Sequence, residues 1–440
     1  MGHKKGFMLI VAYSVVAVIL ILVAAYVSRS VAEVRIAQRE KNSLAALKAA
    51  ESGIDYGFAW LSLQPAPPAG VTPIVNPTIT GVPKPALTTG AYSVTIIPNA
   101  SNPTNWPKKY EIVAVGTSGD STRTVYYEVQ RDTFAKNIWF TNTESYGGTN
   151  VWFVTADSLD GPVHTNDSFN ISGNPSFPDL IDPHPTEQCG PDINYMHPGV
   201  DNPYFAQPVD FNVDPIVMPG HERTEPLRTA AASGGRVFAG STTIILNADG
   251  TMNVTNATGG YNNTNMPIPA NGAIYVQNRV QGNHIAEYGD VNVRGTLNGR
   301  LTIGANDDVT ITGNVLYNNN PQTNPNSTDT LGLVAEGDVI ISQNACPNGA
   351  NSNLTIQAAV MAMADSFYLD NWTSTMKGIL NVYGGITQNQ RGPVGTFNTN
   401  NNSKASGFSK NYLYDRRLRD APPPYYPDTN RYEGAAWRDQ

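Results

Sequence analysis

The stretch FMLIVAYSVVAVILILVAAYV, residues 7–27, decides how this chain is built, because it contains no charged residue. As an α-helix it would measure about 30 Å, which is enough to cross the hydrocarbon core of a bilayer. A removable secretory signal has a shorter apolar stretch followed by small residues, whereas here a charged helical pattern follows at once. The sequence therefore predicts a membrane-spanning helix.

The helix is predicted to continue well beyond its apolar part. Neither glycine nor proline interrupts the chain between Phe7 and Gly53, and both residues would weaken or stop a helix. Apolar residues then recur at three- and four-residue steps, at Leu44, Leu47, Ile54, Phe58 and Leu61. This pattern spans under three heptads, so we interpret it as a face that packs under the chain's own β domain rather than as a free coiled coil.

The basic residues Lys4 and Lys5, followed by Gly6 and Phe7, resemble the leader of type IV pilins and type II secretion pseudopilins. The segment NSLAALKAAESGIDYGFAWL, residues 42–61, is similar to the end of the first helix in PilX-type minor pilins. The resemblance implies that prepilin peptidase cuts between Gly6 and Phe7, and that Phe7 becomes the methylated mature N-terminus. It also implies that the helix has two partners in turn, the lipid bilayer and other pilin-like subunits.

Val11 departs from the pattern of the major subunits in that family, which carry a glutamate five residues into the mature chain. A buried carboxylate is costly without a partner, and in those subunits it pairs with the amine of a neighbouring chain. Val11 cannot form such a pair. The departure implies a minor or tip subunit, and it leaves open a static membrane-anchored adhesin or envelope-binding protein that enters no filament.

The orientation in the membrane is not decided by charge, because basic residues flank the apolar run on both sides. The pilin resemblance, and a remainder poor in Lys and rich in Asn and Thr, place the C-terminal bulk outside the cytoplasm. The expected location is a bacterial inner membrane, crossed once, and then a surface or periplasmic filament. The 28 basic against 36 acidic residues, a net charge of -8, argue against nucleic acid as a partner.

The remainder of the chain predicts mainly β structure, so the fold class is α+β. Alternating apolar residues around Gly119 and Asp120 predict an antiparallel meander. Farther on, short apolar triplets and three Gly/Asp-Asp-Val starts, at Gly289, Asp307 and Gly337, favour a right-handed β-solenoid over the alternative, a β-sandwich. The predicted parts are a leader (1–6), a transmembrane and amphipathic helix (7–62), a proline-rich linker (63–89), the meander packed on the helix (90–132), a solenoid-like domain (133–408) with an irregular insertion (178–235), and a C-terminal cap or tail (409–440).

Metal-binding motifs are missing from the sequence, since the six histidines are scattered and no paired Cys-x-x-Cys occurs. Residues that could still meet in space around a proline-rich loop are Asp157, His164, Asp182, His184 and His197. Such residues are more often turn and surface groups, so we predict no metal site. The segment 247–250, NADG, resembles part of a calcium loop, but without a downstream acid it predicts a hairpin turn.

Carboxylates along a solenoid raise one catalytic alternative, a β-helix carbohydrate-active enzyme. Asp307, Asp308 and Asp338 would be its acid and base. Repeated turn positions explain the same residues, and no Ser/His/Asp order or phosphate-binding loop accompanies them. We therefore predict a protein without catalytic residues or cofactor, whose remaining partner is a surface or glycan ligand.

The chain has two cysteines, Cys189 and Cys346. In an oxidising compartment they could form one long-range disulfide, or they could stay as two buried thiols. The sequence leaves both alternatives open, because it does not show whether the two Cα atoms come within bonding range.

Overall fold

The computed structural model describes residues 3–64, 67–68, 70–81, 84, 87–99, 108–179, 185–346 and 351–439, with side chains from residue 7 onward. The chain forms two compact units. Unit 1 consists of Met1–Pro103, Lys108–Gln130 and Tyr432–Gln440, and unit 2 of Thr104–Pro107 and Arg131–Arg431. A long N-terminal apolar helix followed by a large, mostly β region confirms the α+β prediction.

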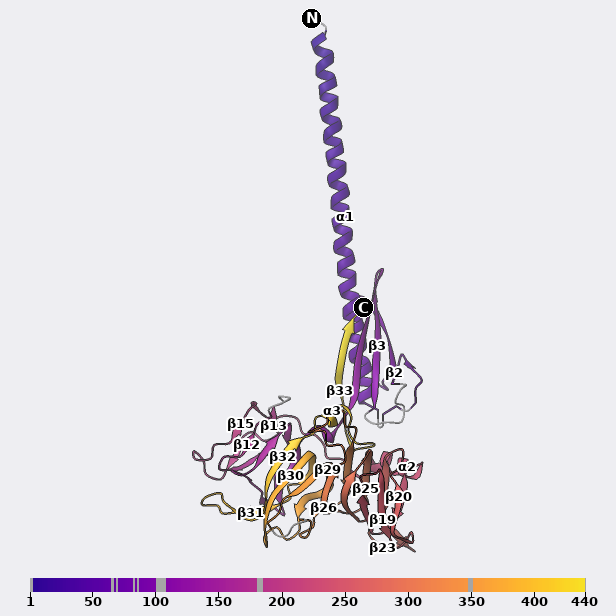
Figure 1. Cartoon of the computed structure of the whole chain (residues 1–440). Helices are drawn as coiled ribbons and strands as arrows, with labels where there is room; N and C mark the ends of the chain where they lie inside the picture. The colour runs from indigo at the N-terminus through magenta and orange to yellow at the C-terminus, as the bar shows by residue number, and fades with distance from the viewer. Residues whose placement is uncertain are drawn as a thin grey trace. The chain divides into compact units, whose positions relative to one another are not determined.

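Unit 1 begins with a single helix, α1 (His3–Ser62), which Figure 1 shows without a break. Its continuity follows from the absence of glycine and proline between Phe7 and Ser52. The last turn tightens at its C-terminal end, where the amide of Gln64 donates to the carbonyl oxygen of Leu61 at 3.1 Å. Prolines follow immediately, so the helix cannot continue.

A five-stranded sheet completes unit 1. Its spatial order is β1 (Ile74–Val75), β2 (Ala91–Pro98), β3 (Lys109–Ser118), β4 (Ser121–Thr133) and β33 (Asp428–Asp439). β2, β3 and β4 pair antiparallel in chain order, with Ser118 opposite Ser121. Gly119 and Asp120 form the tight turn between β3 and β4, and Gly119 has a φ of +55°, a conformation that glycine adopts without strain.

The C-terminal third of α1 packs on this sheet. Ile54 and Leu61 are buried together with Val94 of β2 and Ile112 of β3, and Phe58 packs at the edge of the same cluster. These residues of the apolar face thus cover β2 and β3. Leu44, the first apolar residue of the predicted face, is 55% exposed, so the packed part of the helix begins after it.

Unit 2 is built on three ladders of parallel strands. The first joins β17 (Arg236–Ala239), β21 (Ala273–Gln277), β25 (Arg300–Ala305), β27 (Thr330–Ala335), β29 (Leu354–Leu369), β30 (Met376–Gln390), β5 (Trp139–Thr143), β10 (Val163–Thr165), β13 (Thr186–Gln188) and β16 (Val209–Phe211). The second joins β18 (Thr242–Leu246), β24 (Val291–Leu297), β26 (Val309–Tyr317) and β28 (Val339–Ile341) to β29. The third runs from β24 through β26, β29 and β30 to β32 (Lys404–Tyr414), β9 (Ser158–Asp160), β12 (Ser176–Phe177) and β15 (Tyr204–Phe205).

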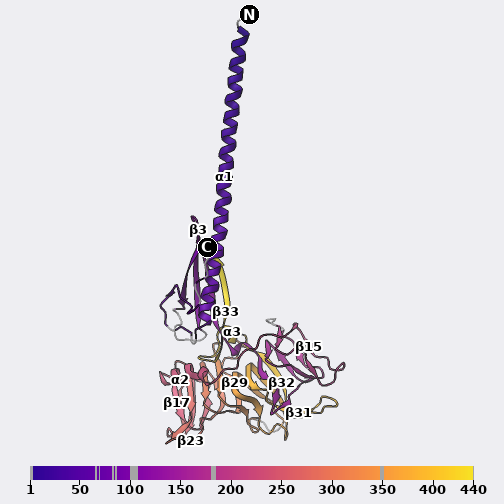
Figure 2. The same ribbon diagram turned by 180° about the vertical axis from the view of Figure 1, so that it is seen from behind.

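The order of strands along these ladders differs from their order in the chain. The chain enters near the middle at β5, runs out to β16, crosses to β17, and returns to β30 and β32 beside its starting point. The two runs meet where Trp139 pairs with Ile386 and Ser158 with Asn411. Figure 1 shows β12, β13 and β15 at one end of unit 2, β29, β30 and β32 in the middle, and α2 (Glu225–Ala232) with β20 (Tyr261–Pro267) at the other end. Figure 2 shows β15, β32, β29 and α2 in the same order from behind.

Shorter elements decorate the ladders. A small parallel sheet consists of β8 (Phe153–Val154), β11 (Asn170–Ser172) and β14 (Asn194–Tyr195). β19 (Thr251–Asn256) pairs antiparallel with β18 on one side and with β20 (Tyr261–Pro267) on the other. The other antiparallel pairs are β6 (Ser145–Tyr146) with β7 (Thr149–Asn150), β22 (Arg279–Gln281) with β23 (His284–Glu287), and β31 (Gly395–Phe397) with β32. The helices of unit 2 are η1 (Phe134–Lys136), η2 (His221–Thr224), α2 (Glu225–Ala232) and α3 (Arg417–Asp420). The segment 178–235 was predicted to be an irregular insertion, but its described part contributes β13, β15 and β16 to the ladders. The sequence did not indicate these strands, because they are too short to show alternation.

Candidate membrane and filament contact site

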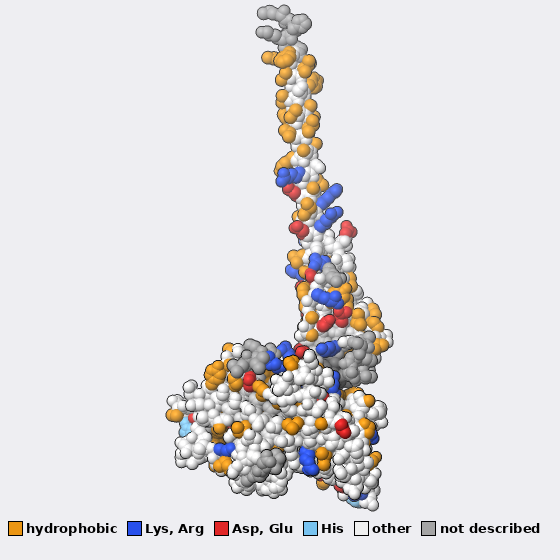
Figure 3. All heavy atoms as spheres, in the orientation of Figure 1, with side chains coloured by type: hydrophobic (Ala, Val, Ile, Leu, Met, Phe, Trp, Pro, Cys, Tyr) orange, Lys and Arg blue, Asp and Glu red, His pale blue; other side chains and the backbone are white. Residues whose placement is uncertain are grey.

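The first half of α1 exposes its apolar side chains. Leu20, Ile21, Leu22 and Val23 are 63, 67, 63 and 52% exposed. Four successive helical residues point in directions about 100° apart, so the apolar surface surrounds the helix. On the face drawn in Figure 3, apolar side chains follow one another along this part of α1 as far as the first Lys or Arg side chains.

A helix that is apolar all round requires an apolar environment. Leaving a Leu or Ile side chain in water forgoes about 1.5–3 kcal/mol of burial free energy. Within the described residues, one helix, α1, is long and apolar enough to cross a membrane, and its apolar window is entirely unburied. The structure therefore presents a single-pass membrane anchor at the N-terminal end of the chain.

A belt of charged residues follows the apolar run. Arg29 and Glu33 form an ion pair one helical turn apart, with Arg29 Nε 3.0 Å from Glu33 Oε1. Both side chains are largely exposed, and a pair of this kind adds only about 0.3–0.5 kcal/mol to the helix. Its position matters more, because charged groups beside an apolar helix mark where the helix enters water.

The predicted processing site lies at the start of this helix. The backbone is helical through Gly6 and Phe7, and Phe7 is 71% exposed. Val11, which stands where major pilins carry a glutamate, is 44% exposed. Cleavage after Gly6 and methylation of Phe7 stay predictions.

The two cysteines are free thiols with separate neighbours. Cys189 Sγ lies 3.7 Å from Asn166 Oδ1, and Cys346 Sγ lies 3.4 Å from the carbonyl oxygen of Ser352. Burial raises the pKa of the Cys189 thiol, and the nearby Glu187 carboxylate adds to the effect.

The structure gives the candidate metal ligands separate roles. His164 is buried, stacks on Phe140 with ring centroids 5.2 Å apart, and bonds through Nδ1 to Glu187 at 2.9 Å. Asp157 pairs with Lys410, and His197 lies 3.4 Å from Asp201. Asp182 and His184 fall outside the described residues. In the part of the chain that the structure describes, no three His, Cys, Asp or Glu side chains converge as metal ligands would.

Asp308 and Asp338, two of the three candidate acids, belong to a ladder of turn caps. Asp290 accepts the amide of Asp308 at 3.3 Å, Asp308 accepts that of Asp338 at 2.8 Å, and Asp338 accepts that of Ser366 at 2.7 Å. Each carboxylate thus holds the turn of the neighbouring strand in the stack, in agreement with the prediction that these aspartates are turn residues.

Crowding of these acids changes their protonation. Burial raises the pKa of Asp307 to about 6, and the neighbouring carboxylates of Asp308, Asp290 and Asp365 contribute. The pKa of Asp338 is raised to about 6 for the same reasons.

In the segment 247–250, Asp249 accepts both the amide and the hydroxyl of Thr251, at 3.0 and 2.6 Å, between β18 and β19. This segment is the predicted hairpin turn.

Glu336 is a residue that sequence reasoning missed. It is almost completely buried, and its oxygens lie 2.6 Å from Thr224 Oγ1, Tyr275 Oη and His221 Nδ1, and 2.9 Å from Asn306 Nδ2. Arg228 forms an ion pair with it. These hydrogen bonds lower the pKa of Glu336 against the opposing effect of burial. Its one sequence signal is a carboxylate that directly follows the apolar run LGLVA.

Residues 106–182 match the model of a family described as a domain of unknown function, DUF4900. No curated protein matches the chain. The crystal structure of the competence-associated pilin ComZ from Thermus thermophilus matches with 14% identity and a TM-score of 0.32, over 91% of this chain and 97% of that one. A TM-score this low does not make the two folds the same.

Proposed function

We propose that this chain is a minor pilin-like or pseudopilin-like structural subunit of a type IV pilus or a type II secretion-like filament. In this proposal α1 first lies in the bacterial inner membrane and then packs against the helices of like subunits. The bulk of the chain lies outside the cytoplasm, and the protein is not an enzyme.

The observation that carries the proposal is the division of α1 into two parts with different surroundings. Its first part is apolar on every side and exposed, whereas its last part, from Ala46, is buried on an antiparallel sheet. A plain membrane anchor needs only the first part. A filament subunit needs both, because the helix must leave the lipid while its outer end stays fixed to a folded head.

The motif Ala49-Ala50-Glu51-Ser52-Gly53 supports the PilX-type assignment with a physical reason. A Cβ on Gly53 would lie 2.9 Å from Cβ of Ala114, and Ala49 and Ala50 are buried. Small residues are therefore required where the helix crosses the sheet.

For unit 2 we propose a right-handed β-solenoid, displayed for assembly or surface adhesion. Three parallel ladders that share β29, and a buried interior with residues such as Ile303, Leu333 and Val360, favour it over a β-sandwich.

The test is mass spectrometry of the full chain, purified in detergent from a bacterium with a prepilin peptidase, to determine the residue at which the chain begins and whether that residue is methylated. The proposal predicts a chain that begins at methylated Phe7. A Gly6→Leu variant serves as the control, and it should retain the leader while remaining in the membrane. A native chain that keeps residues 1–6 would contradict the proposal and would indicate a static membrane-anchored adhesin.

A further inference from the structure

Unit 2 contains a pocket of about 370 Å³ that none of the roles described above uses. It lies between the β6–β7 hairpin, the segment that contains β8, and the β31–β32 hairpin. Its aromatic lining comes from Tyr146, Trp152, Trp372, Phe397 and Phe408. Tyr146 and Trp372 meet edge to face with ring centroids 5.4 Å apart, and this contact stabilises the position of both rings.

The charged groups of the pocket are already engaged. Lys410 and Asp157 are both more than nine-tenths buried, and Lys410 Nζ lies 2.5 Å from Asp157 Oδ2. Lys404 directs its ammonium group at the backbone, and donates to the carbonyl oxygens of Lys377 and Gly378, the latter at 2.9 Å. A charged ligand would therefore have to compete with these contacts.

The unengaged groups of the pocket are neutral. The pocket is lined by Asn150, Trp152, Trp372 and Ser409, and their side chains make no hydrogen bond with any residue that the structure describes. Aromatic faces beside neutral donors and acceptors suit a ligand that carries both C–H faces and hydroxyl groups.

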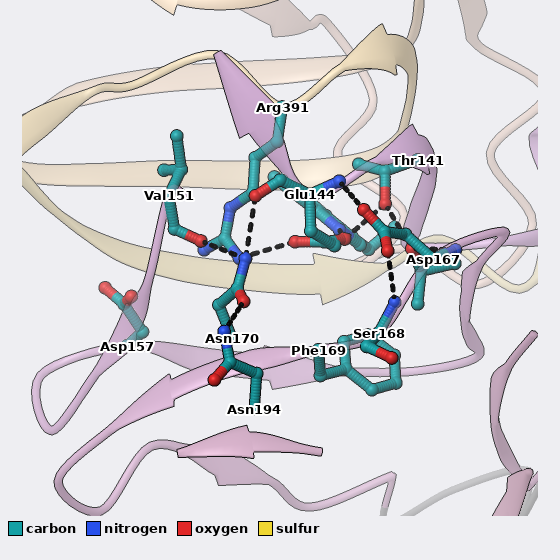
Figure 4. A network of polar contacts seen from close by, with 12 residues as sticks. Thr141, Glu144, Val151, Asp157, Asp167, Ser168, Phe169, Asn170, Asn194 and Arg391 are labelled. Carbon is teal, nitrogen blue, oxygen red and sulfur yellow. Dashed lines mark hydrogen bonds and ion pairs between the residues drawn. The ribbon is translucent and has the colours of Figure 1, made fainter. Parts of the chain in front are cut away.

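A buried polar network holds one wall of the pocket in place (Figure 4). Arg391 Nη1 lies 2.6 Å from Glu144 Oε2, with both side chains fully buried, and the Arg391 guanidinium lies 3.5 Å from the centre of the Phe153 ring. Asn170 Nδ2 donates to the carbonyl oxygens of Glu144 and Val151, at 2.8 and 3.4 Å. The segment that carries Trp152 is therefore fixed before any ligand arrives, which lowers the entropic cost of binding.

We infer that this pocket binds an uncharged saccharide of one or two pyranose rings, whose C–H face stacks on Trp152 or Trp372 while its hydroxyls bond to the indole, amide and hydroxyl groups. The pocket volume falls in the range of small-ligand sites. The inference rests on the proposed function, because display outside the cytoplasm brings the pocket to surface glycans.

The experiment uses the full chain in detergent micelles against an array of uncharged oligosaccharides and matching oligosaccharides that end in uronic or sialic acid. We expect retention of uncharged sugars, and an affinity that falls about tenfold or more in Trp372→Ala and in Trp152→Ala, since each loses a stacking face. The control is Trp437→Ala, which removes a 52% exposed tryptophan from β33 of unit 1 and should bind as the native chain does. Thermal unfolding identifies a variant that has lost its fold, and the other variant then carries the test.

Three results would overturn the inference: no retained uncharged sugar, retention of acidic sugars alone, or unchanged affinity in both folded pocket variants. The mass of the N-terminus and the membrane fraction are measured on the same samples. A chain that is cut at Phe7 and anchored but binds no sugar overturns this inference and leaves the proposed function standing.

Discussion

Gly116 of β3 lies directly against Ala46 of α1, so that a Cβ on Gly116 would stand 2.0 Å from the Ala46 carbonyl oxygen and 2.5 Å from the Ala50 amide nitrogen. Backbone atoms cannot move aside as a flexible side chain can. The helix and sheet of unit 1 therefore approach as closely as they do only because this position has no side chain.

Gly116→Ala should lower the stability of unit 1 by about 2–3 kcal/mol, as overpacking of a tight contact does. The measurement is hydrogen exchange of the β2 and β3 amides in the full chain, which reports unit 1 without requiring that both units unfold together. Gly313→Ala is the matched control, because its Cβ would meet only the flexible Arg294 side chain, at 3.2 Å. Equal protection of the β2 and β3 amides in both variants would contradict the close contact.

The buried pair of Glu144 and Arg391 joins residues 247 positions apart in the chain, close to where the two runs of ladder strands meet. Arg391→Met should cost about 3–5 kcal/mol, because it leaves the Glu144 carboxylate buried without its cation. The loss should appear as faster exchange of the β5 and β30 amides.

A double variant, Glu144→Gln with Arg391→Met, provides the control for this pair. With no charge left to bury, it should be more stable than Arg391→Met alone. If the two substitutions instead add their costs, the pair does not act as a unit.

The crowded acids predict a dependence of stability on pH. The pKa of Asp307 is raised from 3.8 to about 6, so the folded chain holds this proton more tightly than the unfolded chain does. Stability therefore falls as the pH rises from about 4 to about 6, and the destabilisation persists above that range. Asp307→Asn should raise the unfolding temperature at pH 7.5 and leave it unchanged near pH 4.

Asp249→Asn is the control of opposite sign. Its hydrogen bonds from Thr251 lower the pKa of Asp249, so the ionised carboxylate favours the folded chain above pH 3.8, and this contribution is lost as the pH falls. The substitution should not stabilise the chain at pH 7.5. A rise in the unfolding temperature equal to that of Asp307→Asn would mean that general charge reduction, not crowding at Asp307, is responsible.

Local signals predicted the helix of unit 1 and the meander of β2, β3 and β4. They did not predict that the segment 409–440, expected to be a C-terminal cap or tail, supplies the end of β32 to a ladder and β33 to the sheet of unit 1. The apolar run from Phe7 and the absence of helix breakers predicted a single long helix, and the Gly119-Asp120 turn lies where the alternation placed it. These features depend on neighbours in the sequence, which pattern reading captures well.

Long-range relationships were beyond such reading. Nothing near Trp139 indicates that it pairs with Ile386, since parallel pairing leaves no turn between partners to be recognised. Likewise, no local pattern indicates that Trp152 and Trp372 line one pocket. Nor does one indicate that Glu336 binds side chains around α2, such as Thr224. The turn role of Asp308 and Asp338 could be predicted because repeated turn residues follow the strands of successive rungs.

The most direct test of the account is the distribution of the full chain between membrane and soluble fractions for the native protein, Leu20→Arg and Leu44→Arg. Both leucines are exposed on α1, at 63 and 55%, but only Leu20 lies in the apolar run. An arginine at the centre of a spanning helix costs about 2.5–3.5 kcal/mol on insertion scales. We expect the native chain and Leu44→Arg to require detergent for extraction, whereas Leu20→Arg should leave the membrane fraction and form no filament. A native chain that is freely soluble, or a Leu20→Arg chain that is anchored and assembled like the native one, would contradict this expectation.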